Sequence, residues 1–202
     1  MTTIRSVTLE VPDPAAAQEF YASAFDLDGP IGFRAAPDAP TSGFRGFTLS
    51  LVVSQPGTVD SLIGTAVEAG ATSLKPPAKS FWGYGAVVRA PDGAIWKVAT
   101  SSKKDNGPVN REVDEVALLL GVEDVRATKA FYVDRGLTVS KGFGSKYVEF
   151  AGSGPVKLAL YGRRALAKDT GVPADGDGSH RIAVVSDAGP FTDPDGFEWE
   201  DA

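Results

Sequence analysis

Asp193-Pro194-Asp195-Gly196-Phe197-Glu198-Trp199-Glu200, near the end of the 202-residue chain, decides the fold, because an earlier stretch repeats it. Ala90-Pro91-Asp92-Gly93-Ala94-Ile95-Trp96-Lys97 has residues of like type at like spacing, 199 − 96 = 103 positions upstream. Proline presets φ, aspartate bonds its own backbone and glycine takes a positive φ, so each stretch predicts two strands joined by a tight turn.

The segments that open the two copies also match. Residues 7–11 and 116–120 predict strands, and each is followed by an acidic residue and a helix-like stretch that carries Phe-Tyr. The two tyrosines, Tyr21 and Tyr132, lie 132 − 21 = 111 residues apart. The chain therefore predicts a tandem repeat: a first copy at 1–101, a polar linker at 102–110 and a second copy at 111–202.

Each copy reads as a strand, a helix and then several short strands, which is a β-α-β-β-β module of the α+β class. Helices are expected from Pro14 past Phe20-Tyr21, at 59–69 and at 123–134. Strands are expected at 4–11, 46–53, 84–90, 94–100, 113–120, 137–143, 145–150, 156–161 and 180–186, with a last pair around Asp195-Gly196. The first copy is short near 30–46 and the second near 187–190, so the other copy or a second chain must complete the sheets. Exposed sheet edges promote association, and we therefore expect a homodimer.

Composition limits the partners. The 20 basic and 26 acidic residues give 20 − 26 = −6, and no basic run exceeds two residues, which argues against nucleic acid and anionic membranes as partners. The absence of cysteine excludes disulfides, zinc–cysteine sites and thiolate nucleophiles. With no signal-like segment and no apolar run of membrane-spanning length, we expect a cytoplasmic protein.

These motifs together resemble the glyoxalase/bleomycin-resistance/dioxygenase group, the vicinal oxygen chelate superfamily. The resemblance covers nearly the whole chain and implies paired modules whose curled mixed sheets enclose a small-molecule cavity. It also implies a metal held by a residue just before the apolar run of an opening strand and by the glutamate that closes the Asp-Pro-Asp-Gly hairpin.

At those positions the first copy has Ser6 and Lys97, which cannot replace His and Glu around a cation. The second copy has Glu115 and Glu200, and a third position falls on Arg181. We expect the Arg181 guanidinium to stand in for the cation between the two glutamates, so that no metal or other cofactor is bound. The alternative is a divalent-metal site of Glu115, His180 and Glu200, which requires a shift of strand register.

The segment Lys79-Ser80-Phe81-Trp82-Gly83-Tyr84-Gly85 is the richest aromatic cluster. We expect Trp82, Tyr84, Phe81 and Tyr161 to contact a flat ligand, together with Ser6, Lys97, Glu115, Arg181 and Glu200, whereas Trp96 and Trp199 belong to the core. The favoured hypothesis is a metal-independent protein that binds a small organic, aromatic ligand. The alternatives are a metal-dependent lyase, isomerase or dioxygenase, with unknown catalytic residues, and a non-catalytic regulatory module.

Overall fold

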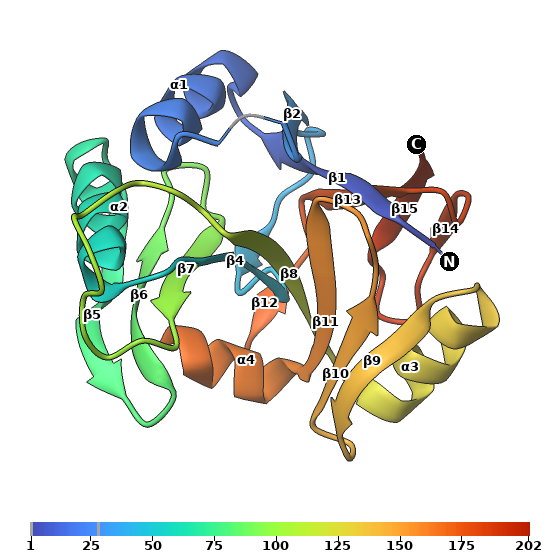
Figure 1. The fold of residues 1–202 in the computed structure, drawn as a ribbon. Helices are drawn as coiled ribbons and strands as arrows, with labels where there is room; N and C mark the ends of the chain where they lie inside the picture. The colour runs from blue at the N-terminus through green and yellow to red at the C-terminus, as the bar shows by residue number, and fades with distance from the viewer. Residues whose placement is uncertain (1, 28) are drawn as a thin grey trace.

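A computed structural model describes residues 2–27 and 29–202, and it has the expected α+β class (Figure 1). The helices are α1 (Pro14–Phe25), α2 (Pro56–Glu68), α3 (Val125–Asp134) and α4 (Arg163–Thr170). The strands of the first copy are β1 (Ile4–Val11), β2 (Ile31–Ala35), β3 (Ser42–Gly43), β4 (Phe47–Val52), β5 (Thr72–Ser80), β6 (Gly83–Arg89) and β7 (Ile95–Thr100). Those of the second copy are β8 (Glu115–Val122), β9 (Thr138–Phe143), β10 (Tyr147–Ala151), β11 (Val156–Gly162), β12 (Gly176–Asp177), β13 (Ile182–Ser186), β14 (Phe191–Thr192) and β15 (Glu198–Asp201).

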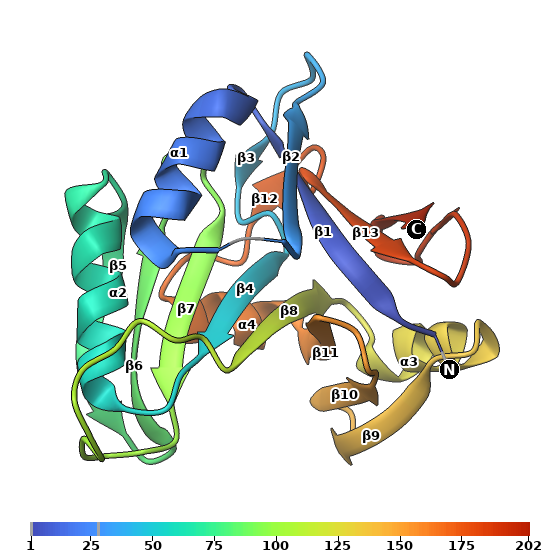
Figure 2. The same cartoon turned by 45° about the horizontal axis from the view of Figure 1, so that its top comes forward.

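The strands form an eight-stranded sheet, a five-stranded sheet and a small two-stranded sheet. The eight-stranded order is β5-β6-β7-β4-β8-β11-β10-β9, and the five-stranded order is β14-β15-β13-β1-β2. Both copies contribute to both large sheets, since β4 pairs with β8 and β1 pairs with β13 (Figure 2). Each copy therefore holds one complete module, β4–β7 with α2 or β8–β11 with α3, and one shortened module. The shortened modules pair with each other, so the other copy, and not a second chain, continues each sheet.

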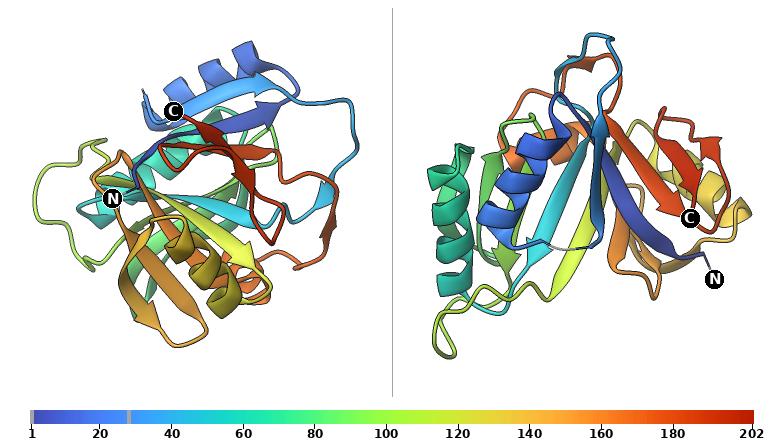
Figure 3. Two further views of the ribbon diagram at one scale, coloured as in Figure 1. Left: turned by 90° about the vertical axis from the view of Figure 1, so that its right-hand side faces the viewer. Right: turned by 90° about the horizontal axis from the view of Figure 1, so that it is seen from above.

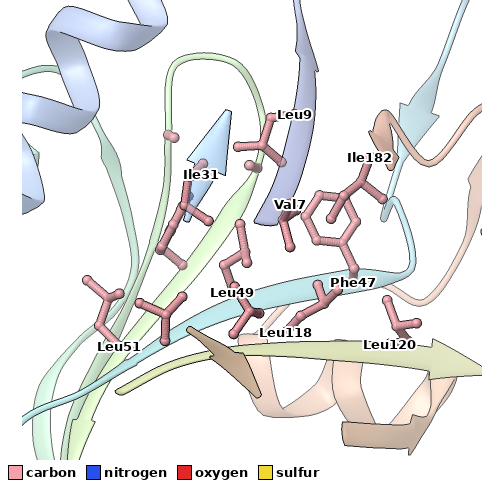
Figure 4. Packing of buried hydrophobic residues seen from close by; sticks show 14 of the residues in the cluster. Val7, Leu9, Ile31, Phe47, Leu49, Leu51, Leu118, Leu120 and Ile182 are labelled. Atoms are coloured by element: carbon pink, nitrogen blue, oxygen red, sulfur yellow. The ribbon is translucent and has the colours of Figure 1, made fainter. Parts of the chain in front are cut away.

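The core lies between the two large sheets. Val7 and Leu9 of β1 point toward Leu49 of β4 and Leu118 of β8, and all four side chains are almost completely buried (Figure 4). The helices α1 and α2 lie side by side and extend this core at one end of the molecule (Figure 3). Each large apolar side chain buried in this way stabilises the fold by roughly 1.5–3 kcal/mol, so this contact helps to hold the two sheets together.

The repeated sequence motifs meet between the sheets. The Tyr21 hydroxyl of α1 donates to Asp92 Oδ2 in the β6–β7 turn at 2.8 Å, and it accepts from Trp96 Nε1 at 3.0 Å. In the second copy, the Tyr132 hydroxyl of α3 donates to Asp193 Oδ2 in the turn before β15 at 2.5 Å. Trp96 and Trp199 are buried, as expected. Each tyrosine therefore joins a helix on one large sheet to the turn that precedes a strand of the other.

Among the elements that the sequence did not predict are the strand β5 and the helix α4. The strand β5 carries Pro76 and Pro77, which is compatible only with its place at the edge of the sheet. The helix α4 has eight residues, and its N-cap is Gly162, which supplies no side-chain hydrogen bond. These two elements shape the candidate site described next.

Candidate ligand-binding site

The face of the eight-stranded sheet opposite the core carries α4, and we call it the inner face. It is defined by Thr48, Ser50, Val87, Ile95, Lys97, Ala117, Leu119 and Ala159, which the strand registers place on one side. Figure 1 shows α4 on the side of the sheet away from α1 and β1. Leu166 and Ala167 of α4 form a small second core with Phe44, Val87 and Ile95.

A groove of about 290 Å³ lies on the inner face, between the β5–β6 hairpin and the C-terminal end of α4. Its floor contains the smallest side chains available, because Ala78, Gly85 and Ala99 are cross-strand partners on three neighbouring strands. A Cβ atom on Gly85 would lie only 3.2 Å from that of Ala99, so the floor is closely packed as well as flat. Such a floor suits a planar molecule.

Charged side chains line this groove. Lys75 and Lys97, whose side chains face the groove, and Asp169 line it, which gives a local charge of 2 − 1 = +1 in a chain of net charge −6. Lys79 borders the groove through its backbone strand, but as the cross-strand partner of Tyr84 it faces the opposite side of the sheet. Lys97 Nζ lies 2.6 Å from Asp169 Oδ2, and the two side chains are 32% and 41% exposed. Lys75 Nζ donates to the backbone carbonyls of Lys168 and Asp169, at 3.0 and 2.5 Å. The lysines therefore fasten the end of α4 to the sheet while remaining accessible from the groove.

The expected aromatic residues of the β5–β6 hairpin point in different directions. Phe81 and Trp82 at its tip are each 82% exposed and pack edge to face, with ring centroids 5.0 Å apart, and Trp82 lines the groove. Tyr84 also borders the groove, but its hydroxyl donates to Asp60 of α2 at 2.8 Å. Its ring therefore lies on the core side of the sheet, because alternate residues of a strand face opposite sides.

Glu115 and Tyr161 lie on the other half of the eight-stranded sheet, near two residues that the sequence did not single out. Tyr161 is the cross-strand partner of Tyr147, with ring centroids 5.3 Å apart, and the Tyr147 hydroxyl donates to Glu149 Oε2 at 3.3 Å. Burial raises the pKa of Tyr147, and the negative charges of Glu149 and Glu115 raise it further. The Tyr147 phenol therefore stays protonated and acts as a hydrogen-bond donor.

The residues of the inner face do not fit a metal ion. Equivalent positions in the opening strands can be found by counting back from the N-cap of the helix that follows each strand. Ser6 lies seven positions before the N-cap Asp13. The same count from the N-caps Gln55 and Asp124 gives 55 − 7 = 48 and 124 − 7 = 117, which are Thr48 and Ala117. Glu115 is thus two residues away from the position equivalent to Ser6. Lys97 lies five residues beyond the centre of its hairpin at 92, and the same position in the β10–β11 hairpin, centred on 154, is Ala159.

The four inner-face positions therefore hold a hydroxyl, an ammonium and two methyl groups, which cannot form a cation site. Thr48 is 1% exposed, and its buried hydroxyl has no hydrogen-bond partner among the described residues. Across residues 2–27 and 29–202, no cluster of three or more His, Cys, Asp or Glu side chains could bind a metal.

The prediction that the Arg181 guanidinium lies between Glu115 and Glu200 is wrong. Arg181 is one residue before β13 and has a left-handed φ of 59°, which turns its side chain toward the loop after β2. There its guanidinium donates to the carbonyls of Pro37 and Ala39, and it contacts neither Glu115, which lies in the other large sheet, nor Glu200. Left-handed backbone at a non-glycine residue is not foreseeable from strand periodicity.

A guanidinium does join two glutamates, but it is that of Arg34. Its NH1 lies 2.6 Å from Glu200 Oε1, and its NH2 lies 2.9 Å from Glu10 Oε1. These residues belong to the five-stranded sheet, where Ser6 pairs with Val185 of β13 and Val185 pairs with Glu200 of β15. Ser6, Glu200 and Arg181 are therefore separated from the groove that contains Lys97 and Trp82.

The alternative metal set is also dispersed. His180 stacks on Phe197 with ring centroids 3.9 Å apart, and its two ring nitrogens lie 2.5 Å from Arg45 O and 2.9 Å from Asp195 O. Both nitrogens are occupied by backbone carbonyls, so the ring is a packed structural group. It is not a ligand shared with Glu115 and Glu200.

Scans of the sequence against protein-family models and against curated proteins gave no match. Solved structures do match. Glyoxalase I from Zea mays superposes over 98% of this chain and 91% of its own with a TM-score of 0.62 at 12% identity. A mutant of the same enzyme superposes over 100% and 92%, with a TM-score of 0.62 at 14% identity. A glyoxalase/bleomycin resistance protein/dioxygenase family enzyme from Burkholderia phytofirmans PsJN aligns with 49% of this chain and 98% of its own, with a TM-score of 0.45 at 25% identity.

The protein is thus a tandem α+β protein of paired modules, as its repeats predicted. Its fold is that of glyoxalase I, which confirms the resemblance at the level of the fold. None of the helices that the structure describes is both long and apolar enough to cross a membrane.

Proposed function

We propose that the protein binds a small, flat organic molecule in the groove on the inner face, without a metal ion. The observation that carries the proposal is the combination of a flat floor of Ala78, Gly85 and Ala99 with the exposed indole of Trp82 beside it. A floor without bulky side chains admits a ring system, and the indole offers a second surface for stacking.

The metal-dependent alternative receives no support from the donor chemistry of the inner face. The positions that would hold a cation carry Thr48, Lys97, Ala117 and Ala159. We therefore derive no lyase, isomerase or dioxygenase step. A regulatory module without a ligand remains the competing hypothesis, and the cytoplasmic location and the homodimer remain predictions.

Binding can be tested with two flat probes, 2-naphthoate and 2-naphthamide, by calorimetry and saturation-transfer NMR in the presence of EDTA. Ala99→Leu places a large side chain on the groove floor, and Ala130→Leu, at an exposed site on α3, is the matched control. We expect at least one probe to bind, Ala99→Leu to weaken it tenfold or more and the control to leave it unchanged. If neither probe binds, or if both variants behave alike, the proposal fails.

A further inference from the structure

We infer that the ligand of this groove is a planar organic carboxylate that binds to Lys97. The Asp169 carboxylate competes with this ligand for the same lysine. The inference rests on the proposed function, which it makes specific. Lys97 Nζ already lies 2.6 Å from the Asp169 carboxylate, and a ligand carboxylate would pair with Lys97 in the same way.

Asp169 is an unusual residue for its place in α4. It is the penultimate residue of the helix, where the exposed carbonyl ends make a negative side chain unfavourable. Lys75 offsets this cost by donating to the carbonyls of Lys168 and Asp169. The carboxylate of Asp169 is thus placed by its contact with Lys97 and not by the preference of the helix.

An exchange of carboxylates at Lys97 requires little rearrangement. Lys75 contacts backbone carbonyls of α4, and Leu166 and Ala167 pack in the second core. The helix therefore stays in place when the Asp169 side chain turns away from Lys97. That side chain is 41% exposed, and water can therefore solvate it after displacement. The ring of an incoming ligand would then lie on the floor between Lys97 and Trp82.

The local charge favours an anion over a neutral or cationic molecule. Lys75 and Lys97 both face the groove, and Asp169 is the only acidic residue among the described residues that line it. The two positive charges on this side of the sheet together attract a single negative charge. The Lys97 ammonium is a compact charge, and the group that it already pairs with is a carboxylate, that of Asp169.

The test compares 2-naphthoate with its neutral analogue 2-naphthamide on four variants, by calorimetry. An exposed ion pair contributes up to ~1 kcal/mol, so we expect Asp169→Asn to tighten naphthoate about fivefold and to leave naphthamide unchanged. Asp134→Asn, on the exposed face of α3, alters the net charge equally and should have no effect. Lys97→Gln should weaken naphthoate about tenfold without affecting naphthamide, and its matched control is Lys129→Gln.

Each outcome has a distinct meaning. If naphthamide binds as tightly as naphthoate, or if Asp169→Asn weakens naphthoate, the carboxylate inference is overturned while the proposed binding function stands. If neither probe binds to the wild-type protein, the proposed function fails and the inference fails with it. Added salt should weaken only naphthoate, since only its binding includes a screened charge pair.

Discussion

Replacing Tyr132 by phenylalanine should destabilise the protein in a pH-dependent way. The Tyr132 hydroxyl donates to Asp193 Oδ2 at 2.5 Å, and both side chains are buried. The other carboxylate oxygen, Oδ1, accepts from the backbone N–H groups of Asp195 and Phe197 at 2.9 and 2.8 Å. A hydrogen bond to a charged group contributes ~1.5–3 kcal/mol. We therefore expect Tyr132→Phe to lower the free energy of unfolding by about 2 kcal/mol at neutral pH, which is a fall in Tm of about 4–8 °C for a chain of this size.

The sign of the pH dependence follows from Asp193. Burial raises its pKa in the folded protein, and the hydrogen bond from Tyr132 lowers it again in part. A raised folded pKa means that the native state binds more protons than the unfolded chain above the ordinary carboxyl pKa, so this contribution to stability falls as pH rises through that window. Tyr132→Phe raises the pKa of Asp193 further. The loss of stability should therefore be larger at neutral pH than at about pH 4, near the ordinary carboxyl value.

Urea unfolding of the variant and the wild-type protein at the two pH values measures this difference. Tyr21→Phe is the internal comparison, because it leaves the uncharged Trp96 Nε1 without its acceptor while water can reach the half-buried Asp92. Tyr21→Phe should destabilise the protein, but its loss of stability should not increase between pH 4 and neutral pH as that of Tyr132→Phe does. Asp193→Asn should abolish the pH-dependent contribution of Asp193 to stability. A Tyr132→Phe protein as stable as wild type at neutral pH, or one that loses more stability in acid, would refute the reasoning.

Three further predictions concern the sheets and the metal. Protein purified without added metal should contain far less than one equivalent of zinc, manganese, iron or nickel by mass spectrometry, and a stoichiometric ion would contradict the donor chemistry of the inner face. Leu166→Ala should lower the free energy of unfolding by ~2–5 kcal/mol in urea titrations, because this fully buried side chain anchors α4; a loss below ~1 kcal/mol would show that α4 does not pack there. Arg181→Gln should be more destabilising than Arg34→Gln in the same assay, because Arg181 is buried against two carbonyls whereas the Arg34 ion pairs are partly exposed and contribute at most ~1 kcal/mol; the reverse order would contradict these assignments.

The sequence predicted those parts of the fold that have a strong local pattern. The strand at 4–11 and the hairpins around Asp92 and Asp195 carry alternation and turn residues, and they lie where expected. The shared architecture of the sheets is not a local property, because the pairing of β4 with β8 joins residues about seventy positions apart along the chain. Periodicity within each copy could indicate the modules, but it could not show that the copies exchange strands.

The candidate site was predictable only in part, for a related reason. The groove is bordered by β5 and α4. The prolines of β5 argue against a strand when only the sequence is known, and α4 has eight residues and no side-chain N-cap, so its helical pattern is weak. Lys97 and Trp82 were found because they belong to motifs. Asp169 was missed because nothing in the sequence brings an aspartate of α4 to a lysine that lies 169 − 97 = 72 residues earlier.

The two hairpin-closing positions show how the repeat has diverged electrostatically. Lys97 in the first copy pairs with the carboxylate of Asp169, and Glu200 in the second pairs with the guanidinium of Arg34. In both copies a side chain of the protein provides the counter-charge at the point where the resemblance implies a metal. The sequence indicated this principle but assigned it to Arg181, since charge can be read from residue types while the partner depends on the backbone turn at position 181. Of the two pairs, only Lys97–Asp169 borders a groove with a flat floor, so that is where an exchangeable ion pair can become a binding site.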